Sequence, residues 1–314
     1  RYTESWMAKG LGISCAGVSE LTEKKTCEEV SRVLATLETA GANSLYTLPN
    51  SVRLSAILGE DPFSPQTIEK NWKNKRKLVF PAGVYVKRQT IDTYMIDFRP
   101  DDQGGKDEFH GMLIGTTGSG KSIFLQSLVL ATAHQHSPRE INFLFMDFKA
   151  GAAELKKISD LPHVVGMITD LTPILADRAL KALENEAKRR KNIFDKATRN
   201  VKDIWDFNSR YPDQELPHLL VVIDEFAEGM KILPDLVDRL VLLGRQGRAL
   251  GVYFLLANQE VNSAVEQLKP NVGWYIVLKV KRSEEMGLID RTLPIAPGRG
   301  RGYIRVRSEI VEFQ

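Results

Sequence analysis

A glycine-rich segment that could bind phosphate lies near the middle of the chain. The pattern G-x-x-x-x-G-K-[ST] is matched in full by consecutive residues: Gly115, Thr116, Thr117, Gly118, Ser119, Gly120, Lys121 and Ser122. Glycines in such a loop let the backbone wrap closely around a phosphate, and the amide groups at the start of the following helix point at the anion. We expect Lys121 to lie against the β- and γ-phosphates and the hydroxyl of Ser122 to bind Mg²⁺. The motif therefore predicts ATP and Mg²⁺ as ligands.

A pair of carboxylates follows a second apolar segment. Residues 219–223 read Leu-Leu-Val-Val-Ile and are followed directly by Asp224 and Glu225. In P-loop ATPases, a strand of this kind ends in one carboxylate that holds Mg²⁺, usually through water, and one that polarises the attacking water. Mg²⁺ keeps several waters and takes few protein oxygens, so Ser122 and Asp224 suffice as its ligands. We therefore predict that Glu225 and Lys121 are catalytic, with surface charges at a strand end as the alternative for the acidic pair.

An amide pair follows a third apolar segment, residues 252–257. We predict Gln259 as a third catalytic residue, because an amide at this strand tip can orient water or sense the γ-phosphate. The alternative is a turn amide that bonds the local backbone. Residues 147–149, Asp-Phe-Lys, end the strand after the P-loop helix and could face the nucleotide, a neighbouring chain or solvent.

Alternating apolar and amphipathic segments are expected to position these residues. The pattern predicts strands at 112–114, 141–146, 219–223, 252–257 and 274–280, and helices at 122–133, 174–194 and 236–247. Strands that are apolar throughout are covered on both faces, which is typical of a parallel sheet with flanking helices. The expected fold class is therefore α/β: a RecA-like P-loop domain with a mostly parallel central sheet and a small N-terminal helical and β extension.

The chain before this core is predicted as a helical segment followed by loops and a small β element. Residues 1–50 are expected to be mostly helical or a linker. Residues 51–77 are loop-rich and end in a basic run from Lys70 to Lys77. Short strands follow at 78–80, 84–86 and 93–98, and a polar loop at 100–108. The predicted domains are 1–50 and an ATPase domain at 51–314, with its P-loop core from about residue 108.

Composition places the chain among ordinary globular proteins. Its 314 residues are 43% apolar and 26% charged with a formal net charge of +3, so no strong field attracts it to nucleic acid or an anionic membrane.

The two cysteines, Cys15 and Cys27, have neither metal-site nor disulfide-framework spacing, and a reducing cytosol is expected. No apolar run approaches the ~20 residues of a membrane helix. Because the sequence begins at Arg1, we expect a fragment of a longer protein.

Taken together, these motifs resemble the FtsK/SpoIIIE family of hexamer-forming motor ATPases. The resemblance covers about residues 50–314. Besides the P-loop it rests on HG at 110–111, MDFKAGA at 146–152, LPHV at 161–164, VVIDEFAE at 221–228, GRALG at 247–251 and LLANQ at 255–259. Within the family, the chain looks closest to the EccC-type ATPases of type VII secretion, through AILGEDP at 56–62, PAGV at 81–84 and QGG at 103–105.

The resemblance implies a motor that couples ATP hydrolysis to the movement of a polymer. The EccC-type branch implies protein export. Its implied partners are ATP, a secreted protein, other ATPase domains of the parent chain or ring-forming copies, and a membrane complex reached through segments outside this chain. It also implies a cytoplasmic domain of a membrane-anchored bacterial protein. Two alternatives stay open: a double-stranded DNA translocase of the FtsK or conjugative type, and a degenerate domain that binds ATP as a scaffold.

Three segments differ from the family pattern. Ala150-Gly151 stands where the family usually has Gly-Gly, and Glu260 rather than Arg follows Gln259. Residues 285–287, Glu-Met-Gly, lack the arginine that in many members reaches a neighbour's nucleotide. The remaining arginines that could take this role are Arg245, Arg248, Arg282 and Arg291, and we expect Arg248 to act within its own subunit.

Several other polar segments are given structural interpretations. Residues 188–191 are interpreted as a solvated helix face, because Glu184 and Glu186 share that helix, and contact with DNA phosphate is the alternative. Residues 298–302 are expected to form a tight, exposed turn between strands, with a phosphate contact as the alternative. The pair His134 and His136 has no Cys or carboxylate partners at metal-site spacing and is expected to lie at a helix end.

Overall fold

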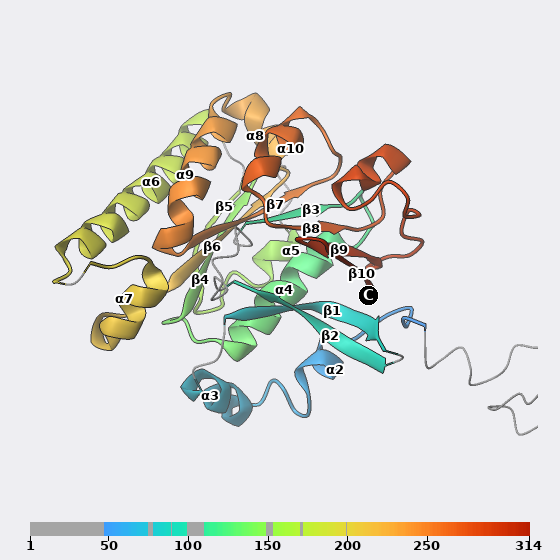
Figure 1. Ribbon diagram of the computed structural model, residues 1–314, viewed down its shortest axis with the longest axis horizontal. Coiled ribbons are helices and arrows are strands. Elements are labelled where there is room, and N and C mark those ends of the chain that lie inside the picture. Colours follow the sequence, from blue (N-terminus) through green and yellow to red (C-terminus); the bar gives the residue numbers. More distant parts are fainter. Residues whose placement is uncertain are drawn as a thin grey trace, which may run out of the picture. The chain divides into compact units, whose positions relative to one another are not determined.

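The computed structural model describes residues 47–74, 78–88, 90–98, 110–148, 153–169, 172–198 and 200–314 (Figure 1). The chain separates into two units, Arg1–Thr47 and Leu48–Gln314, and the fold below is that of the second unit. The helices expected in residues 1–46, the loop expected at 100–108 and residues 149–152 lie outside the described residues.

Within the described residues, ten strands form one mixed sheet in the order β2-β1-β10-β9-β8-β3-β7-β6-β4-β5. The parallel part comprises β3 (Gly111–Ile114), β4 (Ile141–Asp147), β5 (Val164–Ile168), β6 (His218–Asp224), β7 (Val252–Asn258) and β8 (Trp274–Val277). The antiparallel part comprises β1 (Val79–Lys87), β2 (Thr90–Asp97), β9 (Gly302–Val306) and β10 (Glu309–Phe313). The prediction of an α/β P-loop domain with a mostly parallel central sheet is confirmed.

Two helices cover one face of the parallel strands (Figure 1). They are α6 (Pro173–Lys196) and α9 (Leu236–Leu250). Buried residues recur every three or four positions along α6, at Ala176, Ala179, Leu180, Leu183, Ala187 and Phe194, and form the apolar stripe expected of an amphipathic helix. Arg239 of α9 joins the two helices by donating hydrogen bonds to Asp177 (2.8 Å) and Glu184 (2.7 Å).

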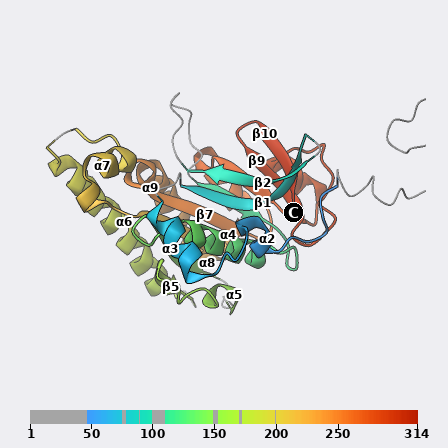
Figure 2. The same cartoon turned by 90° about the horizontal axis from the view of Figure 1, so that it is seen from below.

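The opposite face carries α4 (Lys121–Gln135), which packs against β1 and is flanked by α2 (Leu54–Leu58) and α3 (Pro65–Lys73) (Figure 2). Helix α3 begins where it does because the hydroxyl of Ser64 accepts a hydrogen bond from the Thr67 amide (3.2 Å) and Pro65 suits the first helical position. The indole of Trp72 donates to the carbonyl of Ala133 at 2.9 Å and holds α3 against α4. The prediction that residues 51–77 are loop-rich is therefore wrong at α2 and α3.

Other element bounds also differ from expectation. The strands expected at 78–80 and 84–86 are one strand, β1, with a bulge between Pro81 and Gly83. β2 spans Thr90–Asp97 rather than 93–98, and β8 ends at Val277 rather than at 280. Helix α4 ends at Gln135 with His136 as its C-cap, as expected for this histidine pair. Elements that were not predicted are β5, β9, β10, α5 (Ala153–Lys156), α7 (Ile204–Arg210), α8 (Phe226–Ile232), α10 (Ser263–Leu268) and the 3₁₀ turns Pro212–Gln214, Lys269–Asn271 and Ser283–Leu288.

Candidate nucleotide-binding site

The glycine-rich loop joins β3, which lies between β7 and β8 in the sheet, to the start of α4. Gly118 (φ 82°) and Gly120 (φ 104°) adopt left-handed backbone conformations, which glycine tolerates far better than other residues. The amide of Gly115 donates to the carbonyl of Asn258 at 3.2 Å, so the tip of β7 holds the start of the loop. The loop ends at the N-terminus of α4, where unpaired helix amides and the positive end of the helix dipole would suit an anion.

Lys121, the first residue of α4, lies in a buried cluster of charges. Its ammonium donates a hydrogen bond to Oδ1 of Asp224 at 2.7 Å and another to Oε1 of Glu225. Lys121 and Glu225 are both buried, and Asp224 is partly exposed. The predicted phosphate-binding lysine and the predicted acidic pair are therefore brought together, although they are more than a hundred residues apart in the sequence.

The backbone of Glu225 is what allows two consecutive carboxylates to reach the same ammonium. Glu225 has φ 53° and ψ 48°, in the left-handed region that residues other than glycine seldom adopt. It follows the last residue of β6 and is the N-cap of α8. In an extended strand, consecutive side chains point to opposite faces, so the sharp turn at Glu225 is needed to bring its side chain beside that of Asp224.

An open cleft of about 650 Å³ adjoins the carboxylates. It is lined by Phe148, Glu225, Ala227, Glu228, Asn258, Gln259, Glu260 and Asn262. Gln259 accepts a hydrogen bond from the hydroxyl of Thr117 in the glycine-rich loop at 3.2 Å. The amide of Asn258 instead donates to the carbonyl of Glu260 at 2.7 Å and acts within its own turn.

The residues suited to Mg²⁺ stand next to Lys121. Ser122 follows it in the first turn of α4, and Asp224 contacts its ammonium. A hydroxyl and a carboxylate are oxygen donors of the kind that Mg²⁺ prefers, and two protein ligands leave room for the waters that this ion retains. The donor set therefore fits Mg²⁺ bound to a nucleotide.

Comparison with known proteins identifies the family. The sequence profile of the FtsK/SpoIIIE family matches residues 69–263, which is more than half of the chain. The chain belongs to the FtsK/SpoIIIE family. The ESX-5 secretion system protein EccC5 of Mycobacterium tuberculosis is 38% identical over 232 residues, which cover 70% of this chain and 16% of that protein.

Two further similarities lie within the same branch. The ESX secretion system protein EccC of Thermomonospora curvata is 31% identical over 319 residues, covering 96% of this chain and 24% of that protein. The solved cytoplasmic domain of the T. curvata type VII secretion ATPase EccC superposes with a TM-score of 0.75 at 30% identity, covering 85% of this chain and 32% of the other. The chain thus spans a quarter or less of the length of these two relatives. Among the described helices, none is long and apolar enough to cross a membrane.

A residue of the segment that lacks the family's arginine has a role that the sequence did not indicate: it organises two loops of this FtsK/SpoIIIE domain. Glu285 is only 2% exposed, and its carboxylate accepts hydrogen bonds from the amides of Val261 (3.2 Å), Lys281 (3.1 Å) and Arg282 (3.1 Å). It therefore ties the loop after β7, which carries Gln259, to the loop after β8. The bonds to Lys281 and Arg282 are local, because Glu285 is at position N3 of the 3₁₀ turn and caps its start. The contact with Val261, more than twenty residues earlier, is the part that no local pattern indicates.

The remaining predicted candidates lie outside the cluster around Lys121. Arg245 and Arg248 are exposed on α9, and Arg282 and Arg291 are exposed on either side of the 3₁₀ turn Ser283–Leu288. Asp147, the last residue of β4, is buried rather than exposed to solvent.

Helix α6 does not present a solvated face at Arg190. That residue is 3% exposed; it pairs with Glu186 (2.7 Å) and donates to the carbonyl groups of Leu250 and Gly251 at the end of α9. The solvated-face interpretation is therefore wrong there, because Glu186 and the carbonyls at the C-terminal end of a neighbouring helix hold the guanidinium.

The turn at residues 298–302 lies between β8 and β9 in the chain and packs on the glycine-rich loop. The amide of Gly300 donates to the carbonyl of Ser119 at 2.7 Å, and a Cβ added at Gly120 would come within 2.9 Å of that amide nitrogen. Arg301 donates to the carbonyls of Leu48 (3.1 Å) and Pro49 (2.8 Å). The turn thus supports the loop and anchors the start of the domain.

Proposed function

We propose that residues 48–314 bind MgATP and hydrolyse ATP as one motor domain of a type VII protein-export machine. The observation that carries this proposal is the buried contact of Lys121 with both Asp224 and Glu225. It brings together in one chain the lysine proposed to bind phosphate, the carboxylate proposed to bind the metal and the carboxylate proposed as the base. The similarity to ESX and type VII secretion ATPases supports protein export as the work that hydrolysis drives.

In this proposal each residue has a defined chemical role. Lys121 and the amides at the start of α4 bind the phosphate oxygens and stabilise the charge that develops on them. Ser122 and Asp224 hold Mg²⁺, which neutralises negative charge on the phosphates. Glu225 accepts a proton from the attacking water, whose oxygen bonds to the γ-phosphorus while the bond to the bridging oxygen breaks, leaving ADP and inorganic phosphate. Gln259 orients that water.

The proposed partners follow from the length of the relatives. Because they extend far beyond the matched region, we propose that the parent protein supplies neighbouring ATPase domains and the segments that join a membrane complex. The transported polymer is a secreted protein.

Nucleotide binding is tested by thermal unfolding. A ligand that binds only the folded state raises its stability, and at about 100 times Kd a rise in Tm of about 5 °C is expected for a domain of this size. Lys121→Ala should remove most of that rise, and the control Lys188→Ala, an exposed lysine on α6, should keep it. If MgATP leaves the Tm of the unaltered chain unchanged, the proposed site is wrong.

The export proposal is separated from DNA translocation by adding duplex DNA. A protein that neutralises several DNA phosphates binds with an affinity that falls steeply as salt rises. With a net charge of +3, we expect weak binding at physiological salt and no stimulation of ATP hydrolysis. Tight binding with a steep salt dependence, or DNA-stimulated turnover, would favour a DNA translocase instead.

A further inference from the structure

Two loops at the ends of β7 and β8, the strands on either side of β3, hold the first half of the glycine-rich loop. They are called here the β7 loop (residues 259–262) and the β8 loop (residues 278–282). In the β8 loop, the carbonyl of Lys279 accepts hydrogen bonds from the amide (2.9 Å) and the hydroxyl (3.1 Å) of Thr116. In the β7 loop, Gln259 accepts from the hydroxyl of Thr117 at 3.2 Å. The positions of Gln259 and of both threonines therefore depend on how these two loops are held.

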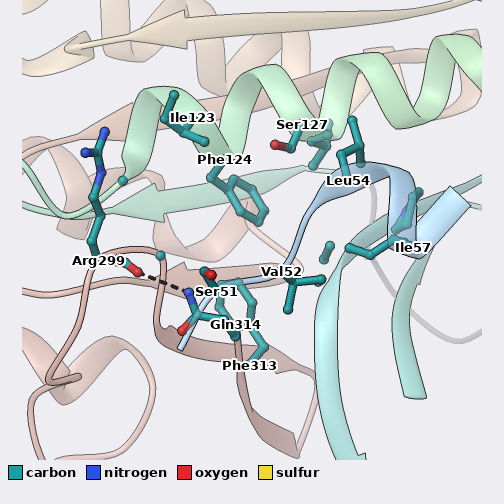
Figure 3. A pocket seen from close by; sticks show the side chains of 16 residues that line it. Ser51, Val52, Leu54, Ile57, Ile123, Phe124, Ser127, Arg299, Phe313 and Gln314 are labelled. Atoms are coloured by element: carbon teal, nitrogen blue, oxygen red, sulfur yellow. Dashed lines mark hydrogen bonds between the residues drawn. The ribbon is translucent and has the colours of Figure 1, made fainter. Parts of the chain in front are cut away.

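The second half of the glycine-rich loop has a separate support. Gly300, in the turn before β9, donates its amide to the carbonyl of Ser119 at 2.7 Å. Figure 3 shows the neighbouring Arg299, whose carbonyl accepts a hydrogen bond from the side-chain amide of Gln314 at 3.1 Å. The start of α4, where phosphate is proposed to bind, is thus held by segments other than the β7 and β8 loops.

Glu285 joins the β7 and β8 loops through the two oxygens of one buried carboxylate. Oε2 accepts hydrogen bonds from the amides of Lys281 and Arg282, both at 3.1 Å. Oε1 accepts from the amide of Val261 at 3.2 Å, two residues after Gln259. A carboxylate suits three converging amides because both of its oxygens only accept.

A second tie between the same loops is exposed. The ammonium of Lys281 lies 2.6 Å from Oε1 of Glu260, with both side chains largely open to solvent. Exposed ion pairs of this kind contribute little, because water screens the charges and two long side chains must be ordered. The buried carboxylate of Glu285 is therefore the contact that determines how the β7 loop lies against the β8 loop.

We propose that Glu285 is a positioning residue for ATP hydrolysis, an inference that rests on the proposed function. By holding the amide of Val261, it fixes the β7 loop so that Gln259 faces the attacking water. Glu285 acts through Gln259 and does not contact the nucleotide itself. Its loss should therefore slow the chemical step, while phosphate binding at the start of α4, which has its own support, is preserved.

The first test replaces Glu285 by glutamine. Glu285→Gln keeps the volume but turns one oxygen into a donor, which then faces a backbone amide that also donates. Single-turnover hydrolysis, with protein in excess and concentrated enough for assembly, isolates the chemical step; its rate should fall about tenfold, with the Kd for MgATP within about twofold. Glu284→Gln, at an exposed position of the same 3₁₀ turn, is the matched control and should keep the full rate. An unchanged rate in folded Glu285→Gln overturns the proposal.

A double variant distinguishes positioning of Gln259 from a general structural role. If Glu285 acts through Gln259, adding Glu285→Gln to Gln259→Ala should slow hydrolysis no further than Gln259→Ala alone. Losses that multiply overturn the proposal. If Glu285→Gln does not fold, Val261→Pro removes the same hydrogen bond from the other partner and leaves the local bonds of Glu285 in place. The same loss of rate is then expected, and an unchanged rate again overturns the proposal.

Hydrogen exchange separates this proposal from the proposed function. The amides of the β7 loop should exchange faster in Glu285→Gln than in Glu284→Gln, whether or not nucleotide is present. Equal exchange in the two variants shows that Glu285 does not hold the loop and overturns the proposal. If the exchange rates differ but the unaltered chain neither binds nor hydrolyses MgATP, the proposed function fails instead.

Discussion

Lys121, at the start of α4, forms a buried ion pair with Glu225. The lysine that we propose for phosphate binding is therefore held by the carboxylate that we propose as the base. Asp224 accepts a second hydrogen bond from the same ammonium at 2.7 Å. In the proposed mechanism, Lys121 would exchange these carboxylate oxygens for phosphate oxygens when ATP binds, and Glu225 would then be free to accept a proton. We therefore expect this ion pair to link nucleotide binding to activation of the base.

The first prediction concerns Glu225. Glu225→Gln keeps the size of the side chain but removes its basicity, so turnover should fall by about 10²–10⁴-fold. The affinity for MgATP should be unchanged or higher, because one carboxylate fewer then competes with the phosphates for the ammonium of Lys121. Steady-state kcat and a direct Kd measurement check this, with Glu228→Gln, the next acidic residue of α8, as the control. Full turnover in Glu225→Gln would show that another group activates the water.

The second prediction separates two roles for Gln259. If its amide orients the water, Gln259→Ala should lower kcat by roughly ten- to hundredfold with little change in Kd. Thr117→Val removes the 3.2 Å hydrogen bond to Gln259 but keeps the amide, and a smaller loss of kcat is expected. Equal losses in the two variants would mean that Gln259 acts mainly by holding the glycine-rich loop. Gln246→Ala, on the exposed side of α9, is the control.

The third prediction concerns acid stability. His110 is buried between α9 and β7: its Nε2 lies 2.9 Å from the carbonyl of Gly244, and its Nδ1 accepts from the amide of Phe254 at 3.0 Å. These bonds require the neutral ring with its proton on Nε2. Burial lowers the pKa of His110 to about 4, and burial likewise lowers the pKa of His218 to about 3.

A histidine whose pKa is lowered in the folded state stabilises the fold above its ordinary pKa of about 6.5 and loses that contribution as pH falls towards the folded value. For His110 the free energy of unfolding should drop by about 2 kcal/mol between pH 7.5 and pH 5. Urea unfolding at the two pH values measures the drop, and His110→Gln should show a drop smaller by about that amount. An equal pH dependence in both proteins would contradict a neutral, buried His110.

The fourth prediction concerns assembly. The cleft beside Glu225 is acidic, with Glu228 and Glu260 also in its lining, and the structure places none of the four candidate arginines in contact with Lys121 or its two carboxylate partners. An arginine supplied by a neighbour is worth about a thousandfold or more in rate in related chemistry. We therefore expect the isolated chain to be mainly monomeric and nearly inactive. To check this, the ATPase rate is measured as a function of protein concentration, and the molar mass of the same samples is measured by light scattering. A dilute monomer with rapid turnover would show that the site is complete within one chain.

The sequence predicts the centre of the fold well because the signals there are local. The glycine-rich loop is one uninterrupted motif, and the apolar run of β6 together with its terminal Asp224 needs no distant partner to be recognised. The start of α3 is also encoded locally, by Ser64 and Pro65, but the helix that follows is mostly polar and has no clear apolar stripe in the sequence.

The features that sequence could not give depend on long-range contacts. The left-handed backbone of Glu225 accompanies a contact with Lys121, more than a hundred residues away, and the start of α8. Strands β9 and β10 are short. β9 is interrupted by Arg305 and β10 is mostly exposed, so neither has the apolar run that identifies the parallel strands. The burial of Arg190 follows from the end of α9, about sixty residues further along the chain.

Arg301 gives the domain a mechanical property. Its guanidinium holds the carbonyls of Leu48 and Pro49, and the adjacent Gly300 is hydrogen-bonded to Ser119 in the glycine-rich loop. We therefore expect a pull on the chain ahead of Leu48 to reach the glycine-rich loop through one side chain and one peptide unit. By the same route, a movement of that loop on nucleotide binding would exert a force on whatever is attached before residue 48.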